Sequence, residues 1–360
     1  MNMTIPGSMT AAVYQGAGRL VVEEVPVPAI GPGELLLRVE SCGICHTDLK
    51  KIKYDLLPGP RIYGHETAGE VVAVGDGVSA YQPGDSVIAF HHIPCETCFY
   101  CERKLYAQCP VYKKVGITAG FEPAGGGFAQ YVRVMDWIVR RGVEKIPPGV
   151  SYETACLVEP VNTCVKAVHQ LAPRAGDVVF IQGQGPIGLI FTMLAKRAGC
   201  HVLATDRMPE RRALALKFGA DAAIDPQAHD IVSLAAGYTK GRGADAVISA
   251  VSGKGLVEEA VRASRPGARL MLFAQTSDQE RIELSGKDIC MGERILMGSY
   301  SASIDLQAES ANLVFSGALR AGELVSHQVP LNDINDGIEL ALHPSGKSLK
   351  IIVQPQRWSK

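Results

Sequence analysis

Hydrophobic and polar positions follow two different rhythms along the chain. Up to about residue 145, short runs rich in β-branched residues are bounded by Gly and Pro, a pattern that predicts short strands joined by turns. These runs are ELLLRVESCGIC (34–45), GEVVAVGDGV (69–78), GDSVIAF (84–90) and FAQYVRV (128–134). The next stretch, VEKIPPGVSYETACL (143–157), is expected to turn helical, with Ser151 as the N-cap.

From about residue 176, apolar strand-like runs alternate with helical ones. This alternation predicts βαβ units and a parallel sheet. The strand-like runs are 176–183, 201–206, 222–225, 244–251 and 268–275, and the helical runs are 186–199, 209–220, 230–240 and 255–267. The last segment, 331–355, reads as one helix and one strand without a further βαβ repeat.

These rhythms predict an α/β protein of two domains. Residues 1–160 and 298–360 would form a β-rich domain, because the final segment does not continue the alternation. Residues 161–297 would form a doubly wound domain with a parallel sheet. A chain of 360 residues is also too long for one ordinary core, which favours the same division.

A nucleotide site is expected where the alternation begins. Gly183, Gly185 and Gly188 stand in G-x-G-x-x-G register, with Pro186 and Ile187 between the last two, at a junction of strand and helix. Such glycines allow a tight turn, an approach of the backbone to a pyrophosphate and close packing of the helix.

An acidic residue closes the next strand of this predicted site. The carboxylate of Asp206 can accept both hydroxyls of an adenosine ribose and would repel a 2′-phosphate, which favours NAD over NADP. Arg207, Arg211 and Arg212 lie close by in sequence and would soften this preference.

Composition and charge limit the cellular compartments and the binding partners that can be expected. Hydrophobic residues make up 47% and charged residues 20% of the chain, and the net charge is −1, so neither disorder nor a nucleic-acid or anionic-membrane surface is expected. The first residues lack the pattern of a secretory signal, and no apolar run reaches the length of a membrane span. We therefore expect a cytoplasmic protein with reduced cysteines.

Four of the ten cysteines lie in one short lobe, near residues 91–112. Cys95, Cys98, Cys101 and Cys109 have the spacing C-x2-C-x2-C-x7-C, which suits a closed, structural zinc site of four thiolates. The alternatives are an iron–sulfur cluster, whose ligand run has a shorter last gap before Pro, and free thiols. His91 and His92, just upstream, read as loop or pocket-lining residues.

A second set of metal ligands is spread over the first domain. Cys45 and His65 both end strand-like segments beside Gly, Glu66 follows His65, and Glu159 precedes the second domain. One thiolate, one imidazole and one or two carboxylates would leave a coordination position open, as a catalytic zinc requires.

These motifs together resemble the zinc-dependent medium-chain alcohol dehydrogenase family over nearly the whole chain. The matching pieces are GICHTD, GHETAGEVVAVG, PGDSVI, the four-cysteine lobe, EP at 159–160 and GQGPIG. The resemblance implies a GroES-like catalytic domain and a Rossmann domain, with two zinc ions per chain and NAD. A Glu at position 159, rather than Cys, resembles the sorbitol and threonine dehydrogenase branches.

The resemblance also implies roles for individual residues. Cys45, His65 and Glu159 would bind the catalytic zinc, with Glu66 close by or exchanging as a ligand. Thr47 would pass on the proton of the alcohol, His46 would lie near the pyrophosphate, and Asp48 would orient the side chains of the zinc site. Lys50 stands where many relatives have the His that ends the relay. Cys42 matches no ligand and is expected to be packed and inert.

The expected activity is hydride transfer between NAD and a secondary alcohol of a polyol, sugar or related hydroxyl compound. Two alternatives stay open: a simple alcohol dehydrogenase or aldehyde reductase of the same family, and a nucleotide-binding protein without catalysis. Relatives are dimers or tetramers, so the resemblance implies a homo-oligomer that binds a small-molecule alcohol and neither nucleic acid nor a membrane.

Overall fold

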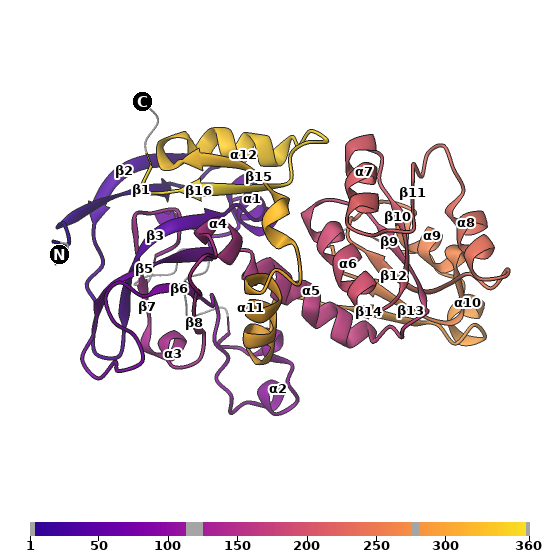
Figure 1. Cartoon of the computed structure of the whole chain (residues 1–360), viewed down its shortest axis with the longest axis horizontal. Coiled ribbons are helices and arrows are strands. Elements are labelled where there is room, and N and C mark those ends of the chain that lie inside the picture. Colours follow the sequence, from indigo (N-terminus) through magenta and orange to yellow (C-terminus); the bar gives the residue numbers. More distant parts are fainter. Residues whose placement is uncertain (1–3, 113–124, 275–280, 358–360) are drawn as a thin grey trace. The chain divides into compact units, whose positions relative to one another are not determined.

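The computed structural model describes residues 4–112, 125–274 and 281–357, which belong to two compact units (Figure 1). One unit consists of Met1–Pro160 with Ser303–Lys360, and the other of Val161–Ala302. The border expected after residue 297 would cut through strand β14 (Ile295–Gly298), whose pairing with its neighbour continues to Gly298. That whole strand therefore belongs to the second unit.

The first unit contains two β-sheets. The smaller sheet has the order β2-β1-β4, and the larger follows the path β15-β16-β3-β5-β6-β8, with β7 paired to β3 outside this path. The strands of the small sheet are β1 (Ser8–Tyr14), β2 (Leu20–Pro26) and β4 (Arg61–Ile62). Those of the large sheet are β3 (Leu35–Gly43), β5 (Glu66–Val74), β6 (Ser86–Ala89), β7 (Tyr131–Val134), β8 (Val143–Lys145), β15 (Val325–Pro330) and β16 (Lys350–Gln354).

Strand β3 is the centre of the large sheet. One of its edges pairs with β5 along its whole length, while the other edge pairs with β7 near its start and with β16 near its end. Both β5 and β16 run antiparallel to β3, so the end of β3 lies beside the start of β5. The C-terminal strand β16 is thereby built into a sheet in which β3, β5, β6, β7 and β8 come from the N-terminal part of the chain.

The helices of the first unit are short. They are α1 (His46–Lys53), α2 (Phe99–Glu102), α3 (Asp136–Val139), α4 (Tyr152–Ala155), α11 (Gln307–Phe315) and α12 (Ile334–Leu342), and α5 (Val158–Leu171) begins in this unit and continues into the other. Ser151 caps α4 as predicted, since its Oγ accepts from the backbone N–H of Thr154. The helical expectation for residues 143–145 is wrong, because these residues pair with β6 as strand β8.

The second unit is a doubly wound α/β fold. Its six strands are all parallel and have the order β11-β10-β9-β12-β13-β14. The strands are β9 (Val178–Gln182), β10 (His201–Thr205), β11 (Ala222–Ile224), β12 (Ala244–Ser249), β13 (Ser264–Leu272) and β14. The direction of winding reverses between β9 and β12, and in such sheets ligands bind at the carboxyl ends of the strands beside this reversal.

Four of the helices that connect these strands lie in the predicted helical runs, whereas the helix at Gly286–Cys290 was not predicted. The helices are α6 (Pro186–Arg197), α7 (Pro209–Lys217), α8 (Ile231–Tyr238), α9 (Leu256–Ala263) and α10 (Gly286–Cys290). Helix α9 ends before residues 264–267, which were expected to be helical, because Pro266 cannot continue a helix and Ser264 already pairs with β12. Gln275, the last residue of the strand expected there, lies outside the described residues.

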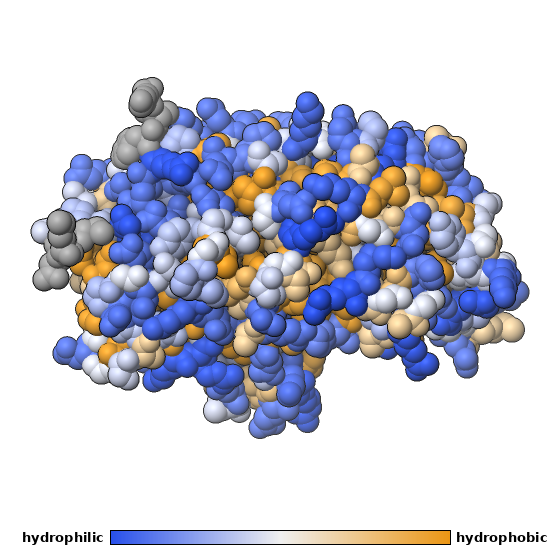
Figure 2. All heavy atoms as spheres, viewed as in Figure 1, coloured by the Kyte–Doolittle hydropathy of each residue, from blue (hydrophilic) through white to orange (hydrophobic). Residues whose placement is uncertain are grey.

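Apolar side chains fill the interior of each unit. In the second unit, one cluster joins Phe180, Leu203, Val247 and Leu270 from neighbouring strands to the helices that cover them. Hydrophilic residues occupy much of the face shown in Figure 2, with hydrophobic residues between them. Among the described helices, none has an apolar stretch that would reach across a membrane.

Candidate metal centres and nucleotide site

The first candidate site forms where β3 ends and β5 begins. Gly43, the last residue of β3, lies opposite Glu66, the first residue of β5. Cys45 then follows β3 as the N-cap of α1, and His65 directly precedes β5. The expectation that His65 ends a strand is therefore wrong; it lies just before one, and the antiparallel pairing of β5 with β3 brings it to Cys45.

Asp48 holds both of these residues. Its Oδ1 lies 3.1 Å from His65 Nδ1, and its Oδ2 accepts from the backbone N–H of Cys45 at 3.3 Å. Asp48 is fully buried, and burial alone would raise its pKa, but the charge of His65 and their hydrogen bond lower it. Since Nδ1 of His65 donates to this carboxylate, Nε2 is left as the nitrogen that can bind a metal.

Three predicted ligands come together in this place. One ligand atom from each of Cys45, His65 and Glu66 lies within 4.8 Å of the others. Burial lowers the pKa of His65, but Asp48 and Cys45 outweigh it and raise the pKa well above its usual value. The surroundings therefore favour a positive charge at His65, which a proton or a metal ion would supply.

Lys350 is a neighbour of this site that the sequence did not reveal. Its Nζ donates to Glu66 Oε1, across 284 positions of sequence. The other oxygen, Glu66 Oε2, is buried and has no hydrogen-bond partner among the described residues. An unpaired buried carboxylate oxygen is unfavourable unless a cation or donor reaches it, so Oε2 fits a metal ligand.

Glu159 lies outside this three-residue group. Its Oε1 is 3.4 Å from His91 Nε2, and burial raises the pKa of Glu159 to about 7. The ring of His91 lies 5.3 Å from that of His65, centroid to centroid, so His91 is a neighbour of both predicted ligands. The sequence predicted His91 only as a loop or pocket-lining residue. Its place directly after the strand predicted at 84–90 was the one feature of the sequence that pointed to a position near the site.

The first turn of α1 carries Thr47, predicted to pass on the proton, and His46, predicted to lie near the pyrophosphate. Thr47 is half-buried and its backbone N–H donates to Cys45 Sγ at 3.5 Å, while His46 is exposed. Cys42 takes no part in the metal group: it is fully buried, and its Sγ lies 3.8 Å from Thr67 Oγ1. Burial raises the pKa of Cys42 well above its usual value, as a packed, inert thiol requires.

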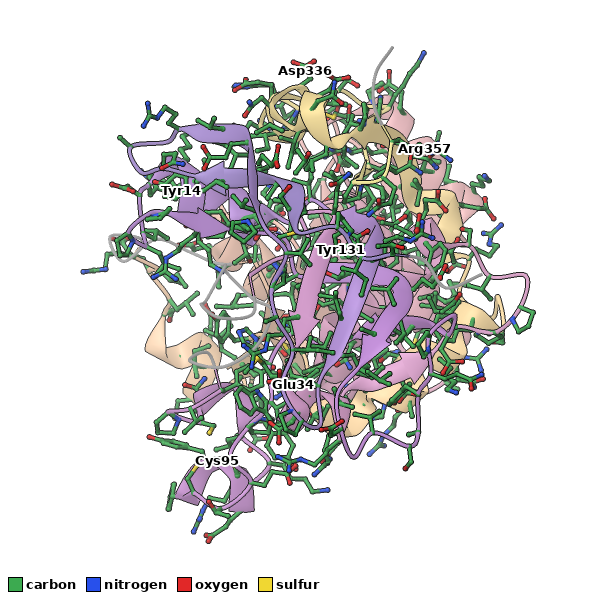
Figure 3. All side chains as sticks on the ribbon, turned by 90° about the vertical axis from the view of Figure 1, so that its left-hand side faces the viewer. Tyr14, Glu34, Cys95, Tyr131, Asp336 and Arg357 are labelled. Atoms are coloured by element: carbon green, nitrogen blue, oxygen red, sulfur yellow. The ribbon has the colours of Figure 1, made fainter. Side chains whose placement is uncertain are left out.

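The four-cysteine lobe forms the second candidate metal centre. Figure 3 shows Cys95 in this lobe, well separated from Tyr131 on the large sheet. All four sulfur atoms lie within 4.8 Å of one another, with Cys95–Cys101 at 4.0 Å and Cys98–Cys101 at 3.5 Å. Tetrahedral zinc with Zn–S bonds of about 2.3 Å would place sulfurs about 3.8 Å apart, so this arrangement fits the ion.

The glycine-rich turn occupies the junction of β9 and α6, at the reversal of winding. Gly183 has φ +85°, and a Cβ there would also overlap Val251. A Cβ at Gly188 would overlap the carbonyl oxygen of Gly183, so this glycine lets α6 pack against the turn. Gly185 is the N-cap of α6, and Pro186 takes the first helical position. A Cβ at Gly185 would meet only Arg211 Nη1, at 3.8 Å, so this side of the turn is open.

Asp206 follows β10 and supports the same turn. Its Oδ2 accepts from the backbone N–H of Gln184, and its Oδ1 from that of Met208, both at 2.8 Å. Each oxygen keeps a second lone pair that can accept from a ribose hydroxyl. Arg212 Nη1 is bound to the backbone carbonyls of Asp206 and Arg207, whereas Arg207 is exposed.

Two family matches cover most of the chain. Residues 31–148 match the alcohol dehydrogenase GroES-like domain, and residues 186–316 match the zinc-binding dehydrogenase family. The sorbitol dehydrogenase of Bacillus subtilis (strain 168) is 30% identical over 99% of this chain and 100% of its own length. The chain belongs to the zinc-dependent medium-chain alcohol dehydrogenase family.

Two further similarities place the chain within this dehydrogenase family. The L-threonine 3-dehydrogenase of Symbiobacterium thermophilum (strain DSM 24528 / JCM 14929 / IAM 14863 / T) is 33% identical over 93% of this chain and 94% of its own. A Sinorhizobium meliloti 1021 protein, described as a zinc-binding dehydrogenase and solved bound to NADP, has a TM-score of 0.88 and 29% identity, covering 97% of this chain and 100% of that one.

Membership of the dehydrogenase family confirms the predicted fold class, a GroES-like domain with a Rossmann domain, and an oxidoreductase activity. It also confirms zinc and a nicotinamide nucleotide as the cofactors at the level of the family. The residues that bind them in this chain, and the choice between NAD and NADP, stay predictions. Both metal centres have the donor atoms that zinc prefers.

We expect two zinc ions per chain, one for each set of ligands. Cys45→Ser should keep one zinc and lose activity, because only the Cys45–His65–Glu66 centre is altered. Cys101→Ser should lose the other zinc and lower the melting temperature, because the thiolates of the lobe would no longer be held together. Metal analysis by mass spectrometry and thermal unfolding check both.

Two cysteines serve as matched controls for these substitutions. Cys42→Ala, three positions before Cys45, and Cys290→Ser, at an exposed site, should keep both zinc ions. Iron in the purified protein, or two zinc ions retained by Cys45→Ser, would contradict the assignment.

Proposed function

We propose that this chain is an NAD-dependent zinc dehydrogenase that oxidises a secondary alcohol of a polyol, sugar or related hydroxyl compound. The support is the group formed by Cys45, His65 and Glu66 and oriented by Asp48, in a chain that also carries a glycine-rich nucleotide turn. One relative is named for sorbitol, a polyol, and another for threonine, which has a secondary hydroxyl group.

The residues of the first unit divide the chemistry among them. Cys45, His65 and a carboxylate from Glu66 or Glu159 would hold the zinc, which as a Lewis acid makes an alcohol proton easier to remove. Asp48 keeps the imidazole of His65 turned toward the ion. The Thr47 hydroxyl, two residues after Cys45 in the first turn of α1, would accept the substrate's proton and pass it on. Lys50, in the next turn of α1, stands where that proton would leave.

A simple alcohol dehydrogenase or aldehyde reductase is the alternative within the family. The match to the GroES-like alcohol dehydrogenase domain fits it equally well, because the substrate pocket is formed by loop residues that no motif determines. We also propose a cytoplasmic location, which agrees with ten cysteines that are all free of disulfides in the structure.

NADH formation by the zinc-loaded protein tests the proposal. The panel consists of sorbitol, other polyols, sugars, L-threonine, vicinal diols and primary alcohols, each with NAD. We expect the highest kcat/KM with a secondary alcohol. Thr47→Val should lower kcat by about 100-fold or more, the usual effect of losing a proton-transfer group.

Thr47→Ser is the matched control, because it keeps the hydroxyl group and should keep most of the activity. Equal rates for Thr47→Val and the wild type would remove Thr47 from the mechanism. Binding of NAD without turnover of any compound in the panel would favour the alternative of a nucleotide-binding protein without catalysis.

Asp206 is expected to select NAD over NADP. Asp206→Asn removes the charge but keeps an acceptor for the turn, so the ratio of kcat/KM for NAD to that for NADP should fall about ten- to hundredfold, the equivalent of one charged hydrogen bond. Asp230→Asn, at the N-cap of α8, makes the same change of charge elsewhere in this unit and should leave the ratio intact. An unchanged ratio for Asp206→Asn would place the ribose elsewhere.

We propose that the chain forms a homo-oligomer through β14. This strand is at the edge of the six-stranded sheet, and its side chains Ile295 and Leu296 are 49% and 37% exposed. Met291, just before the strand, is 75% exposed. An apolar edge strand offers unpaired backbone groups to a second copy of the same strand, which covers both its polar and its apolar groups.

Light scattering after size-exclusion chromatography measures this assembly. The wild type should elute as a dimer or tetramer, and Ile295→Lys should elute as a smaller species, because a charge cannot be buried in the contact without a partner. Leu216→Lys, on α7 with the same exposure of 49%, is the control and should leave the mass unchanged. A monomeric wild type, or an unchanged mass of Ile295→Lys, would refute this interface.

A further inference from the structure

Three neighbouring strands bring together residues from the beginning and the end of the chain. In the large sheet, β3 lies between β16 and β5. Gly43 on β3 is paired with Ile352 on one side and with Glu66 on the other. Lys350 precedes Ile352 by two positions, so its side chain leaves the sheet on the face shared by Gly43 and Glu66. Lys350 therefore reaches Glu66 across the middle strand.

Gly43 provides the space for this crossing. A Cβ on Gly43 would overlap Glu66 Oε2 and would stand 2.9 Å from Lys350 Cε. Gly43 is not among the glycines with positive φ, so its backbone conformation does not require a glycine. A side chain at this position would therefore force the carboxylate of Glu66 to shift from its place beside Lys350.

The pair formed by Lys350 and Glu66 is buried, and it leaves one carboxylate oxygen of Glu66 without a hydrogen bond. The side chains of Glu66 and Lys350 are 1% and 9% exposed. Lys350 occupies Glu66 Oε1, whereas Oε2 has no hydrogen-bond partner among the described residues. One carboxylate oxygen of Glu66 belongs to the group formed with Cys45 and His65. The ammonium group thus restricts Glu66 to one free oxygen and neutralises the carboxylate that would otherwise bind a cation strongly.

We propose that Lys350 is a positioning residue that keeps Glu66 an exchangeable, one-oxygen partner of the metal and so leaves a coordination place for substrate. This inference rests on the proposed function, because it needs a metal at Cys45 and His65. Without the ammonium group, Glu66 would become a firm ligand that holds the ion more tightly and competes with the alcohol. With a side chain at position 43, Glu66 would be displaced from the ion.

Release of Co²⁺ to a chelator, from protein loaded with Co²⁺, tests the inference directly. The signal of the Cys45 centre is the part of the visible absorption that Cys45→Ser lacks. Lys350→Met should release this Co²⁺ about tenfold more slowly, the lower end of the effects seen when residues around metal ligands are replaced, and should shift its visible spectrum. Its kcat should fall more than its KM changes. Lys350→Arg keeps the charge and should resemble the wild type.

A second substitution shows whether Lys350 acts through Glu66. In the background of Glu66→Gln, Lys350→Met should no longer slow the release, because the carboxylate that it frees is absent. If Lys350→Met does not fold, Gly43→Ala provides the test and should speed up the release. Unchanged or faster release from Lys350→Met, an effect that persists with Glu66→Gln, or unchanged release from Gly43→Ala would overturn the inference.

The outcome also separates this inference from the proposed function. Wild-type protein in which the Cys45-dependent cobalt spectrum is missing would refute the proposed metal centre itself. A normal wild-type spectrum with no response to Lys350→Met would refute only the role of Lys350.

Discussion

The carboxylate of Asp48 is the contact on which the arrangement of the metal centre depends. It is buried, and it accepts from the imidazole of His65 with one oxygen and from the backbone of Cys45 with the other. One side chain thereby fixes the ends of two antiparallel strands to the start of α1. Because the carboxylate is held by both partners, the imidazole is turned with its remaining nitrogen toward the thiol.

In the second unit, a single carboxylate likewise fixes the glycine-rich turn of the nucleotide site. Asp206 accepts from two backbone N–H groups, so the residue expected to recognise a ribose also fixes the turn that would receive the pyrophosphate. Gly188 lies against the carbonyl of Gly183, which sets how closely α6 approaches the strand before it. Recognition of the nucleotide, as predicted for Asp206, would therefore use the same carboxylate that fixes the turn.

Local motifs were predictable from the sequence, whereas contacts between distant strands were not. The glycine spacing and the four clustered cysteines are set within short loops, so their geometry follows from adjacent residues. The strand at 143–145 takes its shape from pairing with β6, which local composition does not encode. Lys350 in particular gives no signal in sequence, because its partner lies 284 positions away.

One small volume of the first unit is shared by Gly43, Glu66 and Lys350, so a change at one of these positions affects the other two as the sequence diverges. A side chain gained at position 43 takes space from the carboxylate, and loss of either charged group leaves the other buried alone. A single replacement that adds a side chain at position 43 or removes one of the two charges therefore passes through an unfavourable intermediate. We expect the three residues to be inherited together and exchanged together, so that their joint identity marks a lineage better than any one of them.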